Sequence, residues 1–129
     1  MPLDLDDSRW PVLVATLSGE AIDEEMDEYF AWMDRWLETG EPHAVVLDIR
    51  AGGSNTAKQR RRIAAWIKQR SGQLAATRAG GGCVTESHVV RGIVTAIRWL
   101  IRPPYPWTVT STMAQANVWV AERLRERAP

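Results

Sequence analysis

The loop whose residue types are best suited to bind an anion or to be modified lies in the stretch Arg50–Arg62, which has the sequence RAGGSNTAKQRRR. Two glycines and three small polar residues follow a run, AVVLDI, that is typical of a buried strand, and four cationic residues then fall within positions 58–62. If a helix begins here, its N-terminus presents free N–H groups and the positive end of its dipole to an anion. The hydroxyls of Ser54 and Thr56 could also accept a phosphoryl group, or simply cap the helix.

An anion site in this loop would be formed by Gly52, Gly53, Ser54 and Thr56. The loop lacks the Gly-Lys-Ser/Thr ending of a P-loop and the glycine spacing of a dinucleotide fingerprint. Three interpretations remain open: a helix cap, a regulatory phosphosite, and a site for the phosphate of a ligand. The sequence marks the loop as a candidate phosphosite or anion-binding site without deciding among them.

The cations that follow the loop include Arg60, Arg61 and Arg62. They share a predicted helix with Ile63 and Trp66, which should point inward, so most of the arginines are expected in solvent or against an acidic protein surface. An acidic helix of a second copy is one such surface. Nucleic acid is not expected, because the formal net charge is zero and no DNA-binding motif is present.

The single cysteine, Cys83, lies five positions before His88. A nucleophilic pair needs the thiol and the imidazole within hydrogen-bond reach, but Cys83 falls in the middle of a predicted strand, where it more often fills a core. Glu86 has no second carboxylate near it in sequence. One cysteine and two histidines are also too few for a typical zinc site. We therefore predict no enzyme, no cofactor and no metal.

The chain contains seven tryptophans, which is many for its length. Trp32, Trp36 and Trp99 fall beside the apolar stripes of their predicted helices rather than on them. Large aromatic side chains at the margin of a core favour a partner interface or an apolar groove. Alternatively, they only close the edges of the core.

The length of 129 residues fits one domain over residues 1–129. A lone cysteine excludes an internal disulfide and favours a reducing compartment, and no apolar run approaches the ~18 residues of a membrane span. We expect a cytoplasmic protein. Residues 1–50 hold 13 Asp and Glu against 3 Lys and Arg, whereas residues 51–129 hold 3 against 13. This split favours oriented contacts between molecules, or else acidic and basic helices lie side by side and neutralise each other.

The apolar periodicity predicts strands and helices in alternation. A β-hairpin comes first, and four helices then alternate with three further strands, which gives the order β-β-α-β-α-β-α-β-α. The predicted strands lie near Leu3–Asp6 and Val12–Leu17, and at His43–Ile49, 79–85 and Trp107–Ser111. The predicted helices are Ala21–Glu38, Ala57–Arg70, Val89–Ile101, which should be strongly buried, and Met113–Arg127. Ser18 or Gly19 should precede the first helix, and Gly40 should be its C-terminal cap. Such alternation predicts an α/β fold with a mixed, mostly parallel sheet of four or five strands and about four helices.

This order resembles that of the STAS and SpoIIAA-like family, the fold of anti-sigma-factor antagonists. The segments that carry the resemblance are VVLDIR, QRRRIAAWIKQR, VVRGIVTAIRWL, PPYPWTV and AQANVWVAERL. They cover nearly the whole chain and indicate an uncharacterised bacterial branch of that family. The resemblance implies a STAS/SpoIIAA-like α/β domain that binds protein partners and catalyses nothing.

In that family, phosphorylation of a serine or threonine at the start of one helix switches the binding of partners. The family site follows a strand that ends in Asp and has an Asp-Ser-Gly type motif. The matching place here follows Asp48, where Ser54 and Thr56 stand at the helix start and the Asp-Ser-Gly sequence is absent. The resemblance therefore implies a regulatory interaction module that forms a dimer, with Arg60, Arg61 and Arg62 as docking charges.

A second hypothesis is a small-ligand or lipid-binding domain. It would use a cleft lined by tryptophan, with the backbone of Gly80–Gly82 as one wall. The two hypotheses differ in what fills the exposed apolar surface, a protein in the first case and a small molecule in the second.

Overall fold

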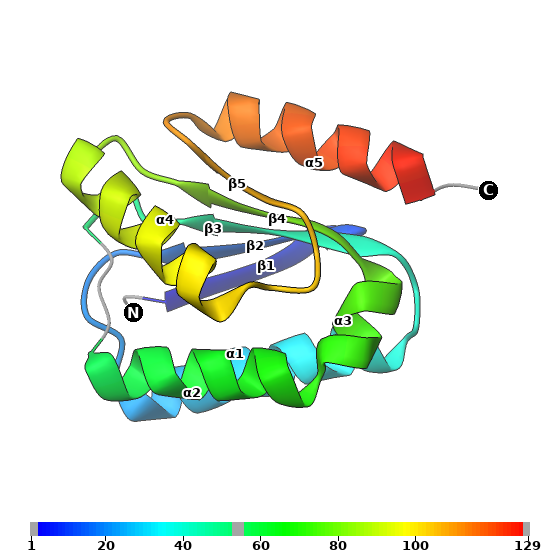
Figure 1. Cartoon of the computed structure of the whole chain (residues 1–129), viewed down its shortest axis with the longest axis horizontal. Coiled ribbons are helices and arrows are strands. Elements are labelled where there is room, and N and C mark those ends of the chain that lie inside the picture. Colours follow the sequence, from blue (N-terminus) through cyan, green and yellow to red (C-terminus); the bar gives the residue numbers. More distant parts are fainter. Residues whose placement is uncertain (1–2, 53–55, 128–129) are drawn as a thin grey trace.

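The computed structural model describes residues 3–52 and 56–127. Five strands form one sheet in the order β1-β2-β3-β4-β5, and five helices pack on its two faces (Figure 1). The strands are β1 (Leu3–Arg9), β2 (Val12–Leu17), β3 (His43–Asp48), β4 (Arg78–Val84) and β5 (Trp107–Thr110). The helices are α1 (Asp23–Glu38), α2 (Ala57–Gln69), α3 (Ser71–Thr77), α4 (His88–Ile101) and α5 (Met113–Arg127).

The first two strands form the predicted hairpin, and β1 runs antiparallel to β2. Every other neighbouring pair is parallel, as the alternation of strands and helices predicted. The short helix α3 was not predicted, because its seven residues, SGQLAAT, show no clear apolar period and follow directly on α2.

Alternate residues of the strands build two separate cores on the two faces of the sheet. On one face α5 alone covers the strands, where Ala116 and Val120 pack on Val46 and Val84. On the other face α1 and α2 supply the larger core, including Met33 and other buried residues. Figure 1 shows α5 on one side of the sheet and α1, α2 and α3 on the opposite side.

The helix α1 begins later than predicted. Its N-cap is Ile22 rather than Ser18 or Gly19. Ile22 has no capping side chain of its own, but the buried carboxylate of Glu25 accepts hydrogen bonds from the backbone N–H groups of Ile22 and Leu3, each at 3.1 Å. Glu25 thus completes the helix start and ties it to β1. At the other end, Gly40 has a φ of +68° and follows the C-cap, which confirms its predicted place.

The acidic helix α1 and the basic helix α2 lie side by side. Arg62 donates to Asp27 at 2.6 Å, and Arg70 donates to Asp34 at 2.5 Å. The structure therefore confirms for this pair of helices that the opposite charges of the two halves of the sequence neutralise each other.

The helix α4 differs most from its prediction. It was expected to be strongly buried, but none of its residues is buried. Its inner side chains, among them Val90 and Val94, are half-buried against the sheet. Its outer side carries a second apolar stripe that faces solvent, formed by Val89, Ile93, Ala96 and Leu100. Apolar content alone predicted burial, whereas the fold provides contacts for only one side of this helix.

Candidate functional site

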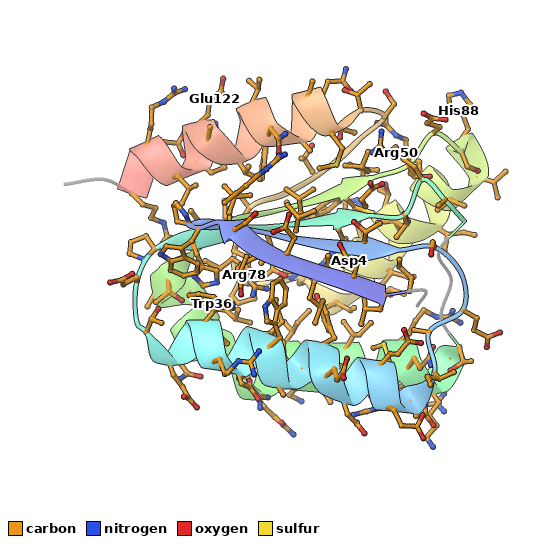
Figure 2. All side chains as sticks on the ribbon, turned by 180° about the vertical axis from the view of Figure 1, so that it is seen from behind. Asp4, Trp36, Arg50, Arg78, His88 and Glu122 are labelled. Carbon is orange, nitrogen blue, oxygen red and sulfur yellow. The ribbon has the colours of Figure 1, made fainter. Side chains whose placement is uncertain are left out.

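The most distinctive polar group of the molecule is the guanidinium of Arg78, at the start of β4. Its side chain is only 3% exposed. Between β3 and β4 the register shifts, so that His43 pairs with Arg78 but Ala44 pairs with Gly80. Gly80 faces α5, and regular alternation would direct Arg78 to that face also. The bulge directs Arg78 to the opposite face instead, between the sheet and α1 (Figure 2).

The surroundings of Arg78 are aromatic and apolar. Its guanidinium lies 5.7 Å from the centre of the Trp66 ring and 5.2 Å from that of Tyr105. Its Nη2 makes a weak contact of 3.7 Å with the sulfur of Met33, its guanidinium interacts with the Tyr105 hydroxyl, and its Nε is buried with no hydrogen-bond partner. Among the described residues, no carboxylate lies within ion-pair distance of Arg78. A buried charge in this state is uncommon, because desolvation penalises it strongly.

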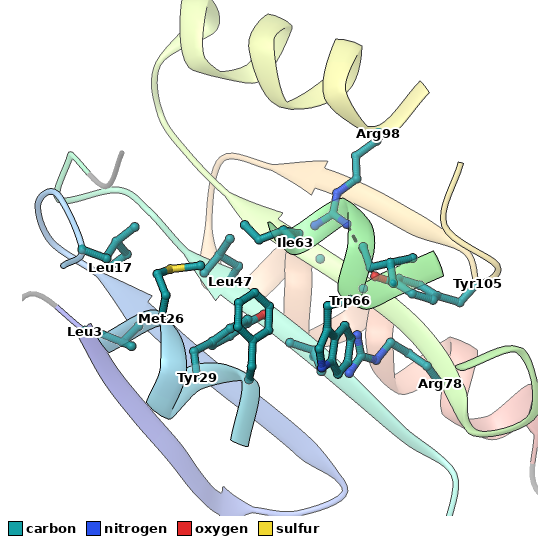
Figure 3. A pocket seen from close by; sticks show the side chains of 16 residues that line it. Leu3, Leu17, Met26, Tyr29, Leu47, Ile63, Trp66, Arg78, Arg98 and Tyr105 are labelled. Carbon is teal, nitrogen blue, oxygen red and sulfur yellow. Dashed lines mark hydrogen bonds between the residues drawn. The ribbon is translucent and has the colours of Figure 1, made fainter. Parts of the chain in front are cut away.

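A cavity of about 100 Å³ opens beside Arg78. Figure 3 shows its lining, which comes from α1, α2, the sheet and the segment before β5. Most of the lining is apolar, including Phe30, Val45 and Ile63. The polar exceptions are Arg78 and Arg98 together with the hydroxyls of Tyr29 and Tyr105, so both charges of the lining are positive.

Arg98 reaches this cavity from α4. Its Nη1 lies 3.5 Å from the hydroxyl of Tyr105 and can donate to it (Figure 3). Burial raises the pKa of Tyr105, but Arg78 and Arg98 lower it, and the balance is a lowered pKa. The Tyr105 ring lies close to the sheet because Gly81 has no side chain, since a Cβ at position 81 would be 2.9 Å from that ring.

His43 stands next to Arg78 in the sheet and is 1% exposed. Its Nδ1 lies 3.1 Å from the carbonyl oxygen of Glu41, and its Nε2 is buried with no partner in the structure. Its ring stacks on Trp10 at 5.7 Å. Burial and the positive charge of Arg78 lower the pKa of His43 to about 4, so the imidazole is neutral at pH 7.

A second cavity, of about 260 Å³, lies beneath α4. It shares Leu17, Leu47, Ile63 and Arg98 with the first cavity, so the two are neighbours. Its lining is almost wholly aliphatic and includes the inner side of α4. The two neighbouring cavities thus have Arg78 and Arg98 in the lining of the first, Arg60 and Arg98 in the lining of the second, and mostly apolar walls elsewhere.

The predicted cleft of the second hypothesis corresponds only in part to these cavities. Gly81 and Gly82 line the first cavity, as expected of a glycine wall. Gly80 does not, because it faces the ring of Trp119 on the α5 side. Of the seven tryptophans, Trp66 is the one that lines the first cavity, among the described residues.

The loop that opened the sequence analysis is described only in part, since Gly53 and Ser54 lie outside the described residues. Gly52 has a φ of +89°, which favours glycine. Thr56 is exposed and is the N-cap of α2. Its hydroxyl accepts from the N–H of Gln59 at 3.1 Å, and the Gln59 side chain accepts from the N–H of Thr56 at 2.9 Å. The structure thus shows the capping role.

The predicted docking arginines have different surroundings. Arg61 is exposed, and Arg60 is exposed at the edge of the second cavity. Arg62 is engaged within the molecule, since it pairs with Asp27 and lies 5.0 Å from the centre of the Phe30 ring.

The predicted interface tryptophans also differ from one another. Trp32 is buried, with its Nε1 3.4 Å from a carboxylate oxygen of Asp7, so its ring is not on the surface. Trp36 is half-buried and stacks on Trp10 at 4.3 Å. Trp99 is 68% exposed and contacts Trp107 edge to face. Of the three, Trp99 is the ring that a partner could reach.

The structure does not assemble a nucleophilic site from Cys83, His88 and Glu86. Cys83 is buried, and burial raises the pKa of its thiol to about 11, which opposes the thiolate form. His88 and Glu86 are exposed at the start of α4. Within the described ranges, no group of three acidic, histidine or cysteine side chains is placed to hold a metal. No described helix combines the length and apolar character that a membrane crossing needs.

The sequence analysis missed Arg78, Arg98, Tyr105 and His43 as a group. They are far apart in the sequence, and the bulge that redirects Arg78 has no local signature. One signal was available, an arginine directly before a glycine-rich buried strand, where a charge is unexpected.

These features sit on a fold that is SpoIIAA-like. A crystal structure with the same arrangement is that of an uncharacterised protein of the DUF3478 family from Shewanella loihica PV-4, described as having a SpoIIAA-like fold. The match has a TM-score of 0.66, covers 92% of this chain and 91% of that chain, and has 11% sequence identity. At this identity the match shows the fold and nothing further. No family model matches the sequence, and no curated protein matches it.

Proposed function

We propose that the chain is a non-enzymatic regulatory module of the STAS type, which binds proteins and pairs with a second copy of itself through the outer stripe of α4. The observation that carries this proposal is the exposure of that stripe. Val89 is 73% exposed, Ile93 53% and Leu100 84%. A helix that is apolar on all sides is normally buried, so one with an exposed apolar side indicates an interaction surface.

The geometry of the stripe supports pairing with an identical copy. Val89, Ile93, Ala96 and Leu100 recur every three or four residues, so they form one continuous ridge along the helix. The ridge contains no charged residue, and two copies can therefore meet across a two-fold axis without repulsion along it. Arg98 and Arg91 are directed elsewhere, Arg98 to Tyr105 and Arg91 to the carbonyl oxygen of Val109 at 2.8 Å.

The test is sedimentation velocity over a range of protein concentrations, with a Val89→Gln/Leu100→Gln variant, because these two residues line neither cavity. The native chain should gain mass with concentration, and the variant should stay monomeric while unfolding at the same denaturant concentration. The matched control is Val118→Gln, because Val118 is 61% exposed on α5, on the opposite face of the sheet. A native chain that remains monomeric at all concentrations contradicts pairing through α4. A Val118→Gln variant that loses self-association as fully as the α4 variant contradicts it too.

The proposed switch of this module is phosphorylation at the start of α2, on Thr56 or Ser54. Thr56 is exposed, and its hydroxyl already faces the first N–H groups of the helix. A phosphoryl group would add about −1.5 to −2 charge at the positive end of the helix dipole. It would strengthen the helix start and neutralise part of the positive charge of Arg60 and Arg61. For Ser54 the proposal rests on the sequence alone.

Mass spectrometry of the chain isolated from its native host tests the switch directly. Phosphate on Ser54 or Thr56, together with altered association of a Ser54→Asp/Thr56→Asp variant, is the expected result. The control is Thr56→Ser, which keeps a capping hydroxyl. Absence of phosphate combined with unchanged association of the Asp variant would end the switch proposal and leave pairing through α4 untouched.

A further inference from the structure

We propose that the cavity at Arg78 binds a small organic carboxylate, with the carboxylate held by Arg78 and Arg98 and an aliphatic body extending beneath α4. This proposal does not depend on pairing through α4 or on phosphorylation. It assigns a ligand class to a site whose polar end is formed by Arg78, Arg98 and Tyr105, with His43 beside Arg78 in the sheet.

The first argument is the state of Arg78 in the ligand-free protein. The guanidinium is nine-tenths or more buried, lines the cavity and has no carboxylate partner among the described residues. Its Nε lacks any acceptor. A carboxylate in the cavity supplies the missing acceptor in the planar, two-oxygen geometry that a guanidinium recognises best. Because the guanidinium is already desolvated and held between Trp66 and Tyr105, little ordering accompanies binding.

The second argument is that both charges of the cavity lining are positive. Arg98 adds a second cation, and the Tyr105 hydroxyl lies 3.5 Å from Arg98 Nη1. No described acidic residue lines either cavity. An anion is therefore favoured over a cation or a neutral polar ligand.

The third argument concerns the body of the ligand. The first cavity, of about 100 Å³, suits a head group, and the second, of about 260 Å³, has aliphatic walls that include Val90 and Val94. Leu17, Leu47 and Ile63 belong to both linings, so a chain can pass from one to the other along apolar side chains. An unbranched alkyl chain fits this elongated space and adds hydrophobic burial to the ionic contact.

The first experiment measures binding of octanoate at pH 7 by isothermal titration calorimetry. Octanol, which has the same chain without the charge, and acetate, which has the charge without the chain, are the matched ligands. Octanoate should bind at least tenfold more tightly than either. Equal binding of octanol and octanoate, or no binding of octanoate at millimolar concentration, would overturn the proposal.

The matched variants are Arg78→Met, which keeps an unbranched apolar stem without the guanidinium, and Arg125→Met, where the arginine is exposed on α5 outside both cavities. Arg78→Met should weaken octanoate binding by about tenfold or more, because a charge-assisted hydrogen bond is lost. Arg125→Met should bind like the native chain. Unaltered affinity in Arg78→Met would remove Arg78 from the site.

The second experiment needs no variant and uses His43 as a reporter of charge at Arg78. The chain has two histidines, and His88 is exposed at the far end of the molecule (Figure 2). The positive charge of Arg78 helps to lower the pKa of His43, so an anion bound to Arg78 should raise it. We expect NMR titration with octanesulfonate, which stays ionised in acid, to raise the pKa of His43 while the ring signals of His88 stay in place. Equal shifts at both histidines, or none at His43, would contradict an anion at Arg78.

Discussion

Among the described residues, Arg70, Arg78 and Arg123 lie over tryptophan rings, and the surroundings of Arg78 and Arg123 differ with the face of the sheet. On the α5 face, Arg123 lies 5.3 Å from the centre of the Trp119 ring and donates to Glu126 at 3.0 Å. On the opposite face, Arg78 lies over Trp66 and has no carboxylate partner in the part of the chain that the structure describes. Both arginines have a buried Nε without a hydrogen-bond partner, but Arg123 is partly exposed and pairs with a carboxylate. Arg78 is almost fully buried and lacks such a pair, and it is the group for which we propose a ligand.

The same contrast extends to the packing of the two faces. Under α5, Trp119 lies directly on the backbone of Gly80, and Ala116 and Val120 are fully buried against β3 and β4. Under α1, α2 and α4 the packing leaves two cavities. One face is therefore closely packed, while the other contains the cavities for which we propose a ligand. Experiments on each face can test this division.

The largest expected effect is the response of the α1 face to acid, through His43. Its pKa in the folded protein is about 4, below the 6.5 of an unperturbed histidine, because the site is buried and Arg78 is near. Between these values the unfolded chain binds more protons than the folded chain, so stability is complete above pH 6.5 and is lost as the pH falls toward 4. The loss should reach about 3 kcal/mol in the free energy of unfolding.

Urea unfolding at several pH values between 7 and 4 measures this loss. A His43→Leu variant has no imidazole at this position, so its free energy of unfolding should fall much less over the same range. His88→Leu is the control, since His88 is exposed and its removal should leave the acid response of the native chain intact. Parallel pH profiles for the native chain and His43→Leu would show that the buried imidazole does not govern acid stability.

Most of the fold was predictable because it depends on apolar periods and strand order, which are local in sequence. The apolar stripes of α1 and α2 and the β-branched run of β3 located these elements in the sequence. The burial of α4 was not predictable in this way, because its outer stripe is as apolar as its inner one and only the fold decides which side has neighbours. The extra helix α3 was missed because seven residues carry too little pattern.

The candidate site was less predictable than the fold. Arg78, Arg98 and Tyr105 come from β4, α4 and the segment before β5, and no spacing connects them. Their meeting depends on the bulge in β4 and on Gly81, which admits the Tyr105 ring. Conversely, the sequence analysis predicted Trp32 as an interface residue, but the structure places its ring in the core. Sequence patterns identify unusual residue types, but contacts between distant segments decide which of them share a site.

The smallest expected effects test the close packing of the α5 face at two glycines of β4. A Cβ at Gly80 would lie 2.7 Å from the Trp119 ring, whereas a Cβ at Gly82 would lie 3.8 Å from Ala116, an ordinary contact. Gly80→Ala should therefore lower the free energy of unfolding by about 2 kcal/mol, because the ring must move. Gly82→Ala should raise it by about 0.5 kcal/mol, because alanine restricts the unfolded chain and fits the folded one.

The two alanine variants are matched in strand, face and chemistry, so urea unfolding of both separates crowding from any general effect of alanine in β4. The Trp119→Leu substitution in the Gly80→Ala background supplies a further check. It removes the crowded ring, so Gly80→Ala should become much less destabilising there than in the native chain. Equal effects of Gly80→Ala in the two backgrounds would mean that the α5 face is as adaptable as the face that holds the cavities, and the division between the two faces would then fail.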